Sequence, residues 1–233
     1  NSNSGKIELS ILDYKLHRGQ KNTSIYLDET INSLSNVDSK FIKKPKANNN
    51  FNKEKQPLTD KMIALVHFGR SGTGLMHSLV DGHPETSTLP SVYFSEYFDH
   101  STWVRITSAG WDGMIDRFIS IYEVLFDATS SVPIKGKNKK LEYNIGINDG
   151  MANVGDRKDE VLRVDKRLFR KELKHLMAFY DELDASIFFK LVHIAHDRAL
   201  NDRNAKSLIF YHIHNPDTYA QLNFAGCNPN ANW

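Results

Sequence analysis

Continuous apolar runs of strand length occur at 62–68 and 207–214 of this chain. Runs without polar alternation are typical of strands that are buried on both faces. A third, shorter strand is expected at 86–90, because an α/β fold returns from a helix to its sheet through a short loop. These three segments predict the strands of an α/β domain.

Apolar residues three and four positions apart predict helices at 75–82, 112–126, 165–183 and 185–200. The apolar face of the third helix comprises Leu168, Leu173, Leu176, Met177 and Tyr180. The order of strand, helix and strand along the chain is that of an α/β fold.

Residues 1–58 differ in composition from the rest of the chain, since Asn, Ser and Lys dominate them. Their apolar stretches are too short to build a core, so we expect a linker or the tail of an upstream region, largely irregular, with disorder over 38–58. The α/β domain is expected to occupy 59–233. Within it, 130–153 is rich in Gly, Lys and Asn and is predicted to form a long loop.

Composition narrows the function without identifying it. A chain of 233 residues with 40% hydrophobic residues can bury a core, and its net charge of +2 argues against a dedicated nucleic-acid partner. The single cysteine, Cys227, permits no intrachain disulfide and fits a reducing compartment, so we expect a cytoplasmic protein. No apolar run reaches the length of a membrane span, so no membrane segment is expected in this chain.

A glycine-rich turn, 69–74, separates the first expected strand from the helix that follows. Glycine lets backbone N–H groups converge on an anion, and the helix N-terminus adds partial positive charge, so this unit predicts a phosphate cradle. Gly69 and Gly74 are spaced as in a Walker A loop, but Leu75 and Met76 stand where that motif has Lys and Ser or Thr. Hydrolysis of ATP or GTP by the usual route is therefore not expected.

The cation of this turn is Arg70, and Ser71 and Thr73 add hydroxyl groups. A planar guanidinium together with several backbone amides suits a tetrahedral oxyanion that needs no metal ion. The alternative interpretation is a Gly/Ser turn that joins a strand to a helix without binding any ligand.

The stretch FGRSGTGLMHSLVDGHPE, 68–85, resembles the 5′-phosphosulfate-binding loop of sulfotransferases that use 3′-phosphoadenosine 5′-phosphosulfate (PAPS). That family typically shows a strand, the sequence (P/G)-R-S-G-T-T, and a helix that ends in D-x-H-P. Residues 69–73 and 81–84 match this pattern at the right separation, and Gly74 departs from it because a second Thr is common there. The resemblance implies a partial P-loop NTPase-like sulfotransferase fold, which is a parallel sheet flanked by helices with the cofactor at the carboxyl ends of the strands.

The resemblance also implies a chemistry. A sulfuryl group would pass from PAPS to a hydroxyl or amine of a carbohydrate or small-molecule acceptor, with no metal ion expected. Arg70 and the turn amides would stabilise charge on the departing 5′-phosphate. The implied cofactor contacts are Gly69, Arg70, Ser71, Gly72, Thr73, Gly74 and Leu75.

A base must take the proton of the acceptor, and in this family it is a His or Glu on a later segment. Glu96 is the first candidate, because it lies between Phe94 and Tyr97 and an aromatic setting raises a carboxyl pKa by desolvation. His100 is the second. The alternative is that Glu96 is a solvated surface acid.

The 3′-phosphate site of the family is an Arg in a strand-end R-x-P, followed by a Ser. The sequence His214-Asn215-Pro216 departs from this motif, whereas 228–233 resembles the F-P-x-A-K turn that precedes it. We therefore expect the 3′-phosphate site to lie beyond Trp233 and the chain to be truncated at both ends.

Two other functions stay open at the level of sequence. One is a P-loop nucleotide-binding, kinase-like protein. The other is a non-catalytic metal-binding module, because His193 and His196 on a helix and His212 and His214 on a strand would suit Zn²⁺ if they converged. The acceptor and the oligomeric state are not readable from the residues.

Overall fold

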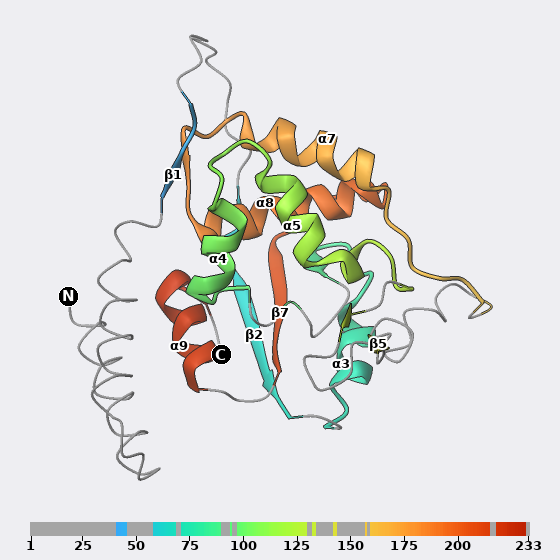
Figure 1. The fold of residues 1–233 in the computed structure, drawn as a ribbon. Helices are drawn as coiled ribbons and strands as arrows, with labels where there is room; N and C mark the ends of the chain where they lie inside the picture. The colour runs from blue at the N-terminus through green and yellow to red at the C-terminus, as the bar shows by residue number, and fades with distance from the viewer. Residues whose placement is uncertain are drawn as a thin grey trace.

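The computed structural model describes ten stretches of the chain, which Figure 1 shows as coloured ribbon. They are 41–45, 58–68, 71–89, 94, 97–129, 132–133, 142–143, 157, 159–214 and 218–231. The predictions for residues 1–40 and for most of the loop 130–153 therefore lie outside the described residues.

A three-stranded parallel sheet forms the centre of the fold, as predicted for an α/β domain. Its strands are β2 (Met62–His67), β7 (Leu208–His214) and β3 (Thr86–Thr88), in the spatial order β2-β7-β3. All three coincide with the predicted strands. The last of these strands in the chain, β7, therefore lies between the two earlier ones, β2 and β3. In the two common strand orders of doubly wound folds, the first two strands of the chain are neighbours in the sheet.

The four predicted helices are present, the first two residues earlier than predicted and the other three with shorter bounds. They are α3 (Thr73–Val80), α5 (Met114–Ile121), α7 (Lys166–Met177) and α8 (Ala185–Ala199). The prediction of one helix over 112–126 is wrong in detail, because Tyr122 leaves helical geometry and a 3₁₀ turn, η3 (Glu123–Leu125), follows.

The third predicted helix, 165–183, ends early as well, and its last two residues form β6 (Glu182–Leu183). Carboxylates fix where the two long helices begin. The Asp165 side chain accepts hydrogen bonds from two amides of the first turn of α7, and the Asp184 side chain accepts one from Ile187 N in α8.

Outside the predicted loop 130–153, two helices and one strand pair escaped prediction. They are α4 (His100–Thr107), α9 (Thr218–Cys227) and the antiparallel pair of β1 (Ile42–Lys43) with β6. Residues of α9 have no apolar stripe at helical spacing, so no pattern marks the helix. The strand β1 lies in the stretch expected to be disordered, and it is ordered by pairing with a segment far away in sequence.

The predicted loop 130–153 contains a further short element. Its described residues form β4 (Val132–Pro133) and β5 (Glu142–Tyr143), which pair antiparallel. Two-residue strands give no periodic signal in a sequence, because the signal of a strand is repetition.

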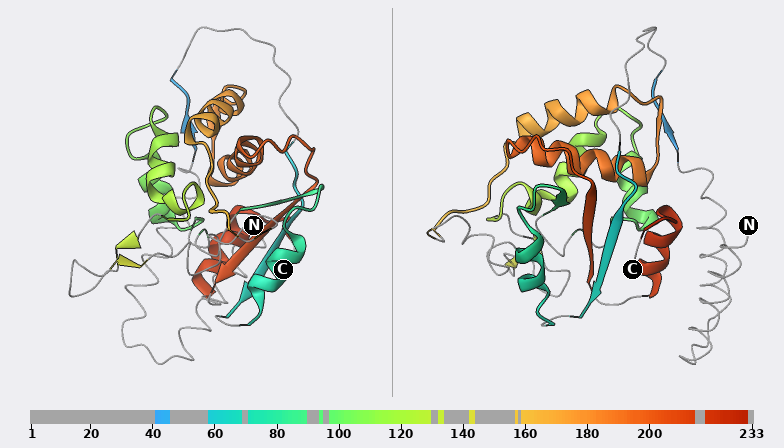
Figure 2. Two further views of the ribbon diagram at one scale, coloured as in Figure 1. Left: turned by 90° about the vertical axis from the view of Figure 1, so that its right-hand side faces the viewer. Right: turned by 180° about the vertical axis from the view of Figure 1, so that it is seen from behind.

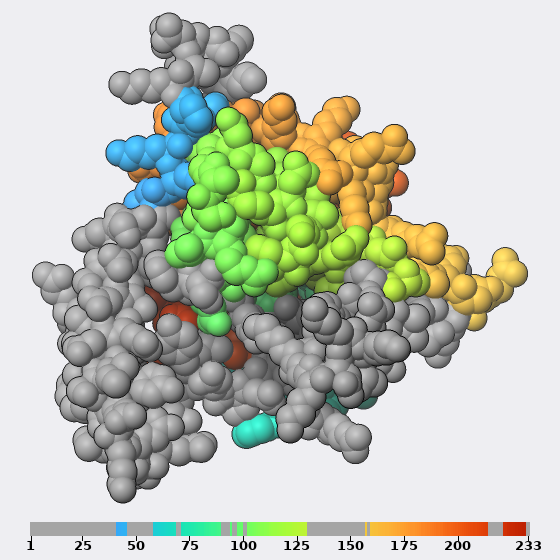
Figure 3. Space-filling model, in the orientation of Figure 1, coloured from blue at the N-terminus to red at the C-terminus, as the bar shows by residue number. Residues whose placement is uncertain are grey.

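Different helices cover the two faces of the sheet (Figure 2). Ala64 and Tyr211 are paired in register and face α8, with α7 packed against α8 from outside. Leu65 and His212 are paired on the opposite face, which α3 covers. The α8 face is thickly covered, since α4, α5 and α7 add a further layer, and Figure 3 shows these three helices side by side on the surface.

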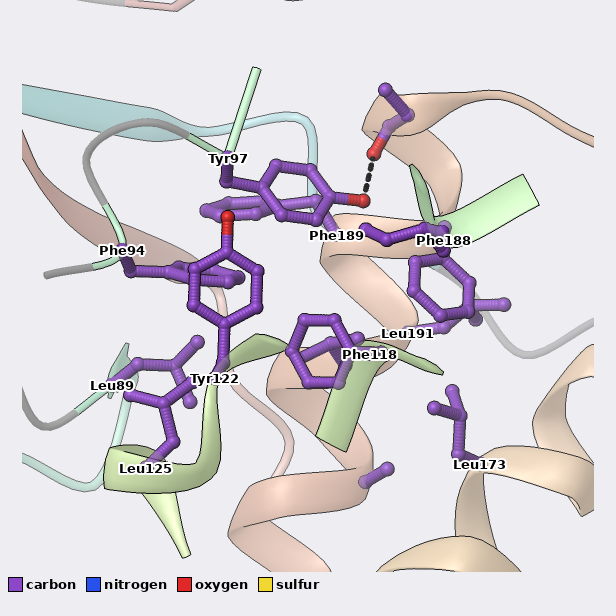
Figure 4. Close-up of a cluster of buried hydrophobic side chains, with 14 of the residues drawn as sticks. Leu89, Phe94, Tyr97, Phe118, Tyr122, Leu125, Leu173, Phe188, Phe189 and Leu191 are labelled. Carbon is purple, nitrogen blue, oxygen red and sulfur yellow. Dashed lines mark hydrogen bonds between the residues drawn. The ribbon is translucent and has the colours of Figure 1, made fainter. Parts of the chain in front are cut away.

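Aromatic side chains fill the core on the α8 face (Figure 4). Phe94 stacks on Phe189 with ring centroids 5.3 Å apart, and the Tyr97 hydroxyl donates to Ala185 O at 2.9 Å. Trp103 is 4% exposed and packs on Phe188, so it belongs to this core. No helix among the described residues is long and apolar enough to cross a bilayer.

Candidate functional site

The glycine-rich turn connects the carboxyl end of β2 to the first turn of α3. Gly72 occupies the N-cap position of α3 with φ 81° and ψ 11°, a left-handed conformation that favours glycine. Its carbonyl accepts the first helical bond, from Met76 N at 3.1 Å, and no side chain caps the helix. The Ser71 hydroxyl donates to Phe68 O at 2.6 Å, which holds the turn closed.

This geometry leaves the amino end of α3 facing outward. Gly74 and Leu75 are exposed, and Thr73 is half-buried. Backbone N–H groups of a first helical turn have no partner within their own helix, and they carry the positive end of its dipole. The described part of the turn is therefore suited to holding an anion.

Several predicted site residues lie outside the described residues. They are Gly69 and Arg70 in the turn and Glu96 as the expected base. His100 begins α4, but its side chain is not described. The roles of these residues stay predictions.

The D-x-H-P segment after α3 builds the return to the sheet. The Thr88 hydroxyl donates to Asp81 Oδ1 at 2.5 Å, and Glu85 N donates to His83 Nδ1 at 3.2 Å. Thr86 N donates to His83 O at 3.1 Å. These bonds set where β3 starts, so this half of the motif has a structural role in the described chain.

Three imidazoles form a series beneath α3. His77 Nδ1 lies 2.8 Å from His212 Nε2, and His212 Nδ1 lies 3.4 Å from His67 Nε2. His67 Nδ1 is in turn 3.4 Å from Phe68 O. Burial lowers the pKa of His77, and one proton on each ring satisfies every link, so the geometry suits three neutral imidazoles.

The two histidines of α8 lie on the opposite face of the sheet. His193 Nδ1 is 2.9 Å from the Ser87 hydroxyl, and His196 Nε2 is 3.2 Å from Leu125 O. They cannot meet His212, which lies under α3, so the predicted convergence of His193 and His196 with His212 is wrong. The side chain of His214 lies outside the described residues. Over the described ranges, no group of three or more His, Cys, Asp or Glu is arranged to hold a metal ion.

Ser87, His193 and Asp197 form a buried polar group that the sequence did not indicate. The Ser87 hydroxyl donates to Asp197 Oδ2 at 2.7 Å, so the serine bridges the histidine and the acid. In a nucleophilic triad the histidine is the bridge, and this arrangement therefore differs from one. Burial lowers the pKa of His193 to about 3 and raises that of Asp197 to about 7.

Comparisons of the chain with protein-family models, with curated proteins and with solved structures give no match. The resemblance to sulfotransferases therefore depends on two short segments, the turn at 69–74 and the residues 81–84 that follow α3.

Proposed function

We propose that the chain is a PAPS-dependent sulfotransferase that transfers a sulfuryl group to a hydroxyl or amine of a carbohydrate or small molecule. One observation carries the proposal. Gly72, in a left-handed conformation, opens the uncapped amino end of α3 at the carboxyl end of β2, inside the sequence Gly-Arg-Ser-Gly-Thr. In open parallel sheets, ligands bind at this end of the strands.

The residues present fit a phosphosulfate better than a nucleoside triphosphate with Mg²⁺. Leu75 and Met76 occupy the first turn of α3, and both are exposed apolar side chains that offer no ligand to a phosphate-bound metal ion. The hydroxyl of Thr73, the amides of the first turn and the guanidinium of Arg70 would hold a tetrahedral oxyanion without a metal.

The proposed step is an in-line displacement. The donor supplies the sulfuryl group, whose bond to the 5′-phosphate oxygen breaks as the acceptor oxygen or nitrogen bonds to sulfur. Glu96, or His100 in its place, takes the proton of the acceptor. Arg70 and the amides at the amino end of α3 stabilise the negative charge that develops on the departing phosphate.

The test compares two nucleotides by isothermal titration calorimetry. We expect adenosine 3′,5′-bisphosphate to bind more tightly than ATP with Mg²⁺. The reverse order would overturn the proposal in favour of a kinase-like nucleotide-binding protein.

A glycine pair supplies the matched control. We expect Gly72→Ala to weaken binding of adenosine 3′,5′-bisphosphate about tenfold or more, because an L-residue at φ 81° displaces the amides of the cradle. Gly110→Ala imposes the same strain at φ 79° in a surface turn and should leave binding unchanged. Equal binding by both variants would show that the turn does not hold the nucleotide.

A further inference from the structure

A cavity of about 480 Å³ opens at the amino end of the parallel sheet, where β2, β3 and β7 begin. Its volume is that of an ordinary small-molecule site. The glycine-rich turn lies at the other end of β2, roughly 20 Å away at about 3.3 Å of rise per residue. A molecule in this cavity would therefore occupy a site separate from the proposed phosphosulfate cradle.

The floor of the cavity is polar and buried. Ser87, His193 and Asp197 are 2%, 1% and 9% exposed, and they join β3 to α8 through bonds of 2.9 and 2.7 Å. Ile194 and Ile209 flank them as apolar walls. Because Ser87 gives its proton to Asp197, the floor presents oxygen acceptors, which suit a hydroxyl group of a ligand.

Basic side chains outnumber acidic ones around the cavity, five to three among its described lining residues. One of the three acids is Asp197, which carries only part of a charge near neutral pH because burial raises its pKa to about 7. A second is Asp60, whose side chain is 80% exposed. Arg198 and Arg203 share a single further carboxylate, that of Glu172, at 3.3 and 3.4 Å. The lining therefore keeps an excess of positive charge, which favours an anion.

Lys190 is the side chain best placed to receive that anion. It is 13% exposed, and its Nζ lies 2.6 Å from Asp60 Oδ1. An ion pair with one solvated partner contributes little to stability, so an incoming anion can replace the Asp60 carboxylate at small cost. Lys206, 8% exposed, lies on the same lining and is held by Asp202 at 2.6 Å.

We propose that this cavity binds a small organic anion that carries a hydroxyl group. Its acidic group bonds to Lys190 in place of Asp60, and its hydroxyl group donates to the oxygen acceptors of Ser87 and Asp197. The apolar walls leave space for a short carbon chain between the two polar ends.

The experiment uses glycerol 3-phosphate as the probe, with inorganic phosphate and glycerol as its two halves. Calorimetry is done on the Arg70→Ala variant, so that phosphate binding at the glycine-rich turn is weakened and the cavity supplies most of the signal. We expect glycerol 3-phosphate to bind about tenfold more tightly than inorganic phosphate, and glycerol to give no heat. Equal affinities for glycerol 3-phosphate and inorganic phosphate would overturn the proposal.

Two substitutions in the cavity and one control, all in the same background, locate the site. Lys190→Met should weaken glycerol 3-phosphate binding about tenfold, whereas Lys171→Met, on the exposed surface of α7, should leave it unchanged. Ser87→Ala should remove the preference for glycerol 3-phosphate over inorganic phosphate. Equal loss in the Lys190→Met and Lys171→Met variants would show that the anion binds a general basic surface instead of the cavity.

Discussion

The two ends of the parallel sheet differ in how their polar groups are assembled. At the carboxyl end, Ser71, Gly72 and Thr73 are consecutive residues, and they are exposed or half-buried. At the amino end, Ser87 and Asp197 are 110 positions apart in the chain, yet they share a hydrogen bond in a buried setting. A site made by a local turn leaves a motif in the sequence, whereas a site made by packing does not.

The difference extends to the energetics. The described groups of the glycine-rich turn, at the carboxyl end, remain solvated, so their arrangement costs the fold little and leaves them accessible to a ligand. Groups at the amino end have lost water, and each must find a partner inside the protein. The two ends should therefore respond differently to substitution, with loss of binding and turnover at one end and loss of stability at the other.

The largest expected effect concerns turnover at the carboxyl end. Glu96→Gln removes the proposed base and should lower kcat by about 10² to 10⁴, because general base catalysis contributes about that factor. Binding of adenosine 3′,5′-bisphosphate should be unchanged. The measurement is sulfuryl transfer from PAPS to a panel of acceptors, together with calorimetry.

Two variants make this result specific. Glu182→Gln changes an exposed glutamate of β6 in the same way and should keep full turnover. His100→Gln tests the second candidate. Full turnover in Glu96→Gln with loss in His100→Gln would assign the base to His100.

The elements that the sequence predicted are those with a local signal. Each of these elements carries its whole signal in its own residues. That signal is an apolar run in β2 and β7, and apolar residues at helical spacing in α7 and α8. By contrast, α9 has no apolar stripe and packs through Phe224, which stacks on Tyr211 with ring planes 13° apart. Contacts with other parts of the fold stabilise that helix, and its own residues carry no pattern that predicts it.

The same reasoning separates the correct from the wrong histidine predictions. The spacing of His193 and His196 places both on one helix, and that much holds. To predict whether they converge with His212, one must know which face of the sheet α8 covers. In register, His212 pairs with Leu65 on the α3 face, and no local pattern fixes which helix crosses to which face.

A second expected effect is the dependence of stability on pH. The pKa of Asp197 rises from 3.8 to about 7 on burial, so between about pH 4 and pH 7 the folded protein holds a proton that the unfolded chain releases. The contribution of Asp197 to the free energy of unfolding therefore falls as pH rises through this window. Relative to the wild type, Asp197→Asn should gain on the order of 3 kcal/mol across it.

His193 and His196 act in the opposite direction. Burial lowers their pKa values to about 3 and about 4, so protons bind the unfolded chain first and stability rises with pH up to about 6.5. Urea titrations at several pH values check both statements. Parallel curves of unfolding free energy against pH for the wild type and Asp197→Asn would show that Asp197 is solvated, and that the amino end resembles the carboxyl end after all.

The smallest expected effect compares two serines, one at each end of the sheet. Ser87→Ala leaves the buried Asp197 carboxyl and His193 ring without their shared partner, and should lower the free energy of unfolding by about 1–3 kcal/mol. Ser71→Ala removes a bond from an exposed hydroxyl to Phe68 O, and water replaces it, so the change should stay within about 0.5 kcal/mol. Urea denaturation measures both. Equal losses would mean that the turn is a structural element of the fold, and an open anion cradle at the carboxyl end would then lose its main support.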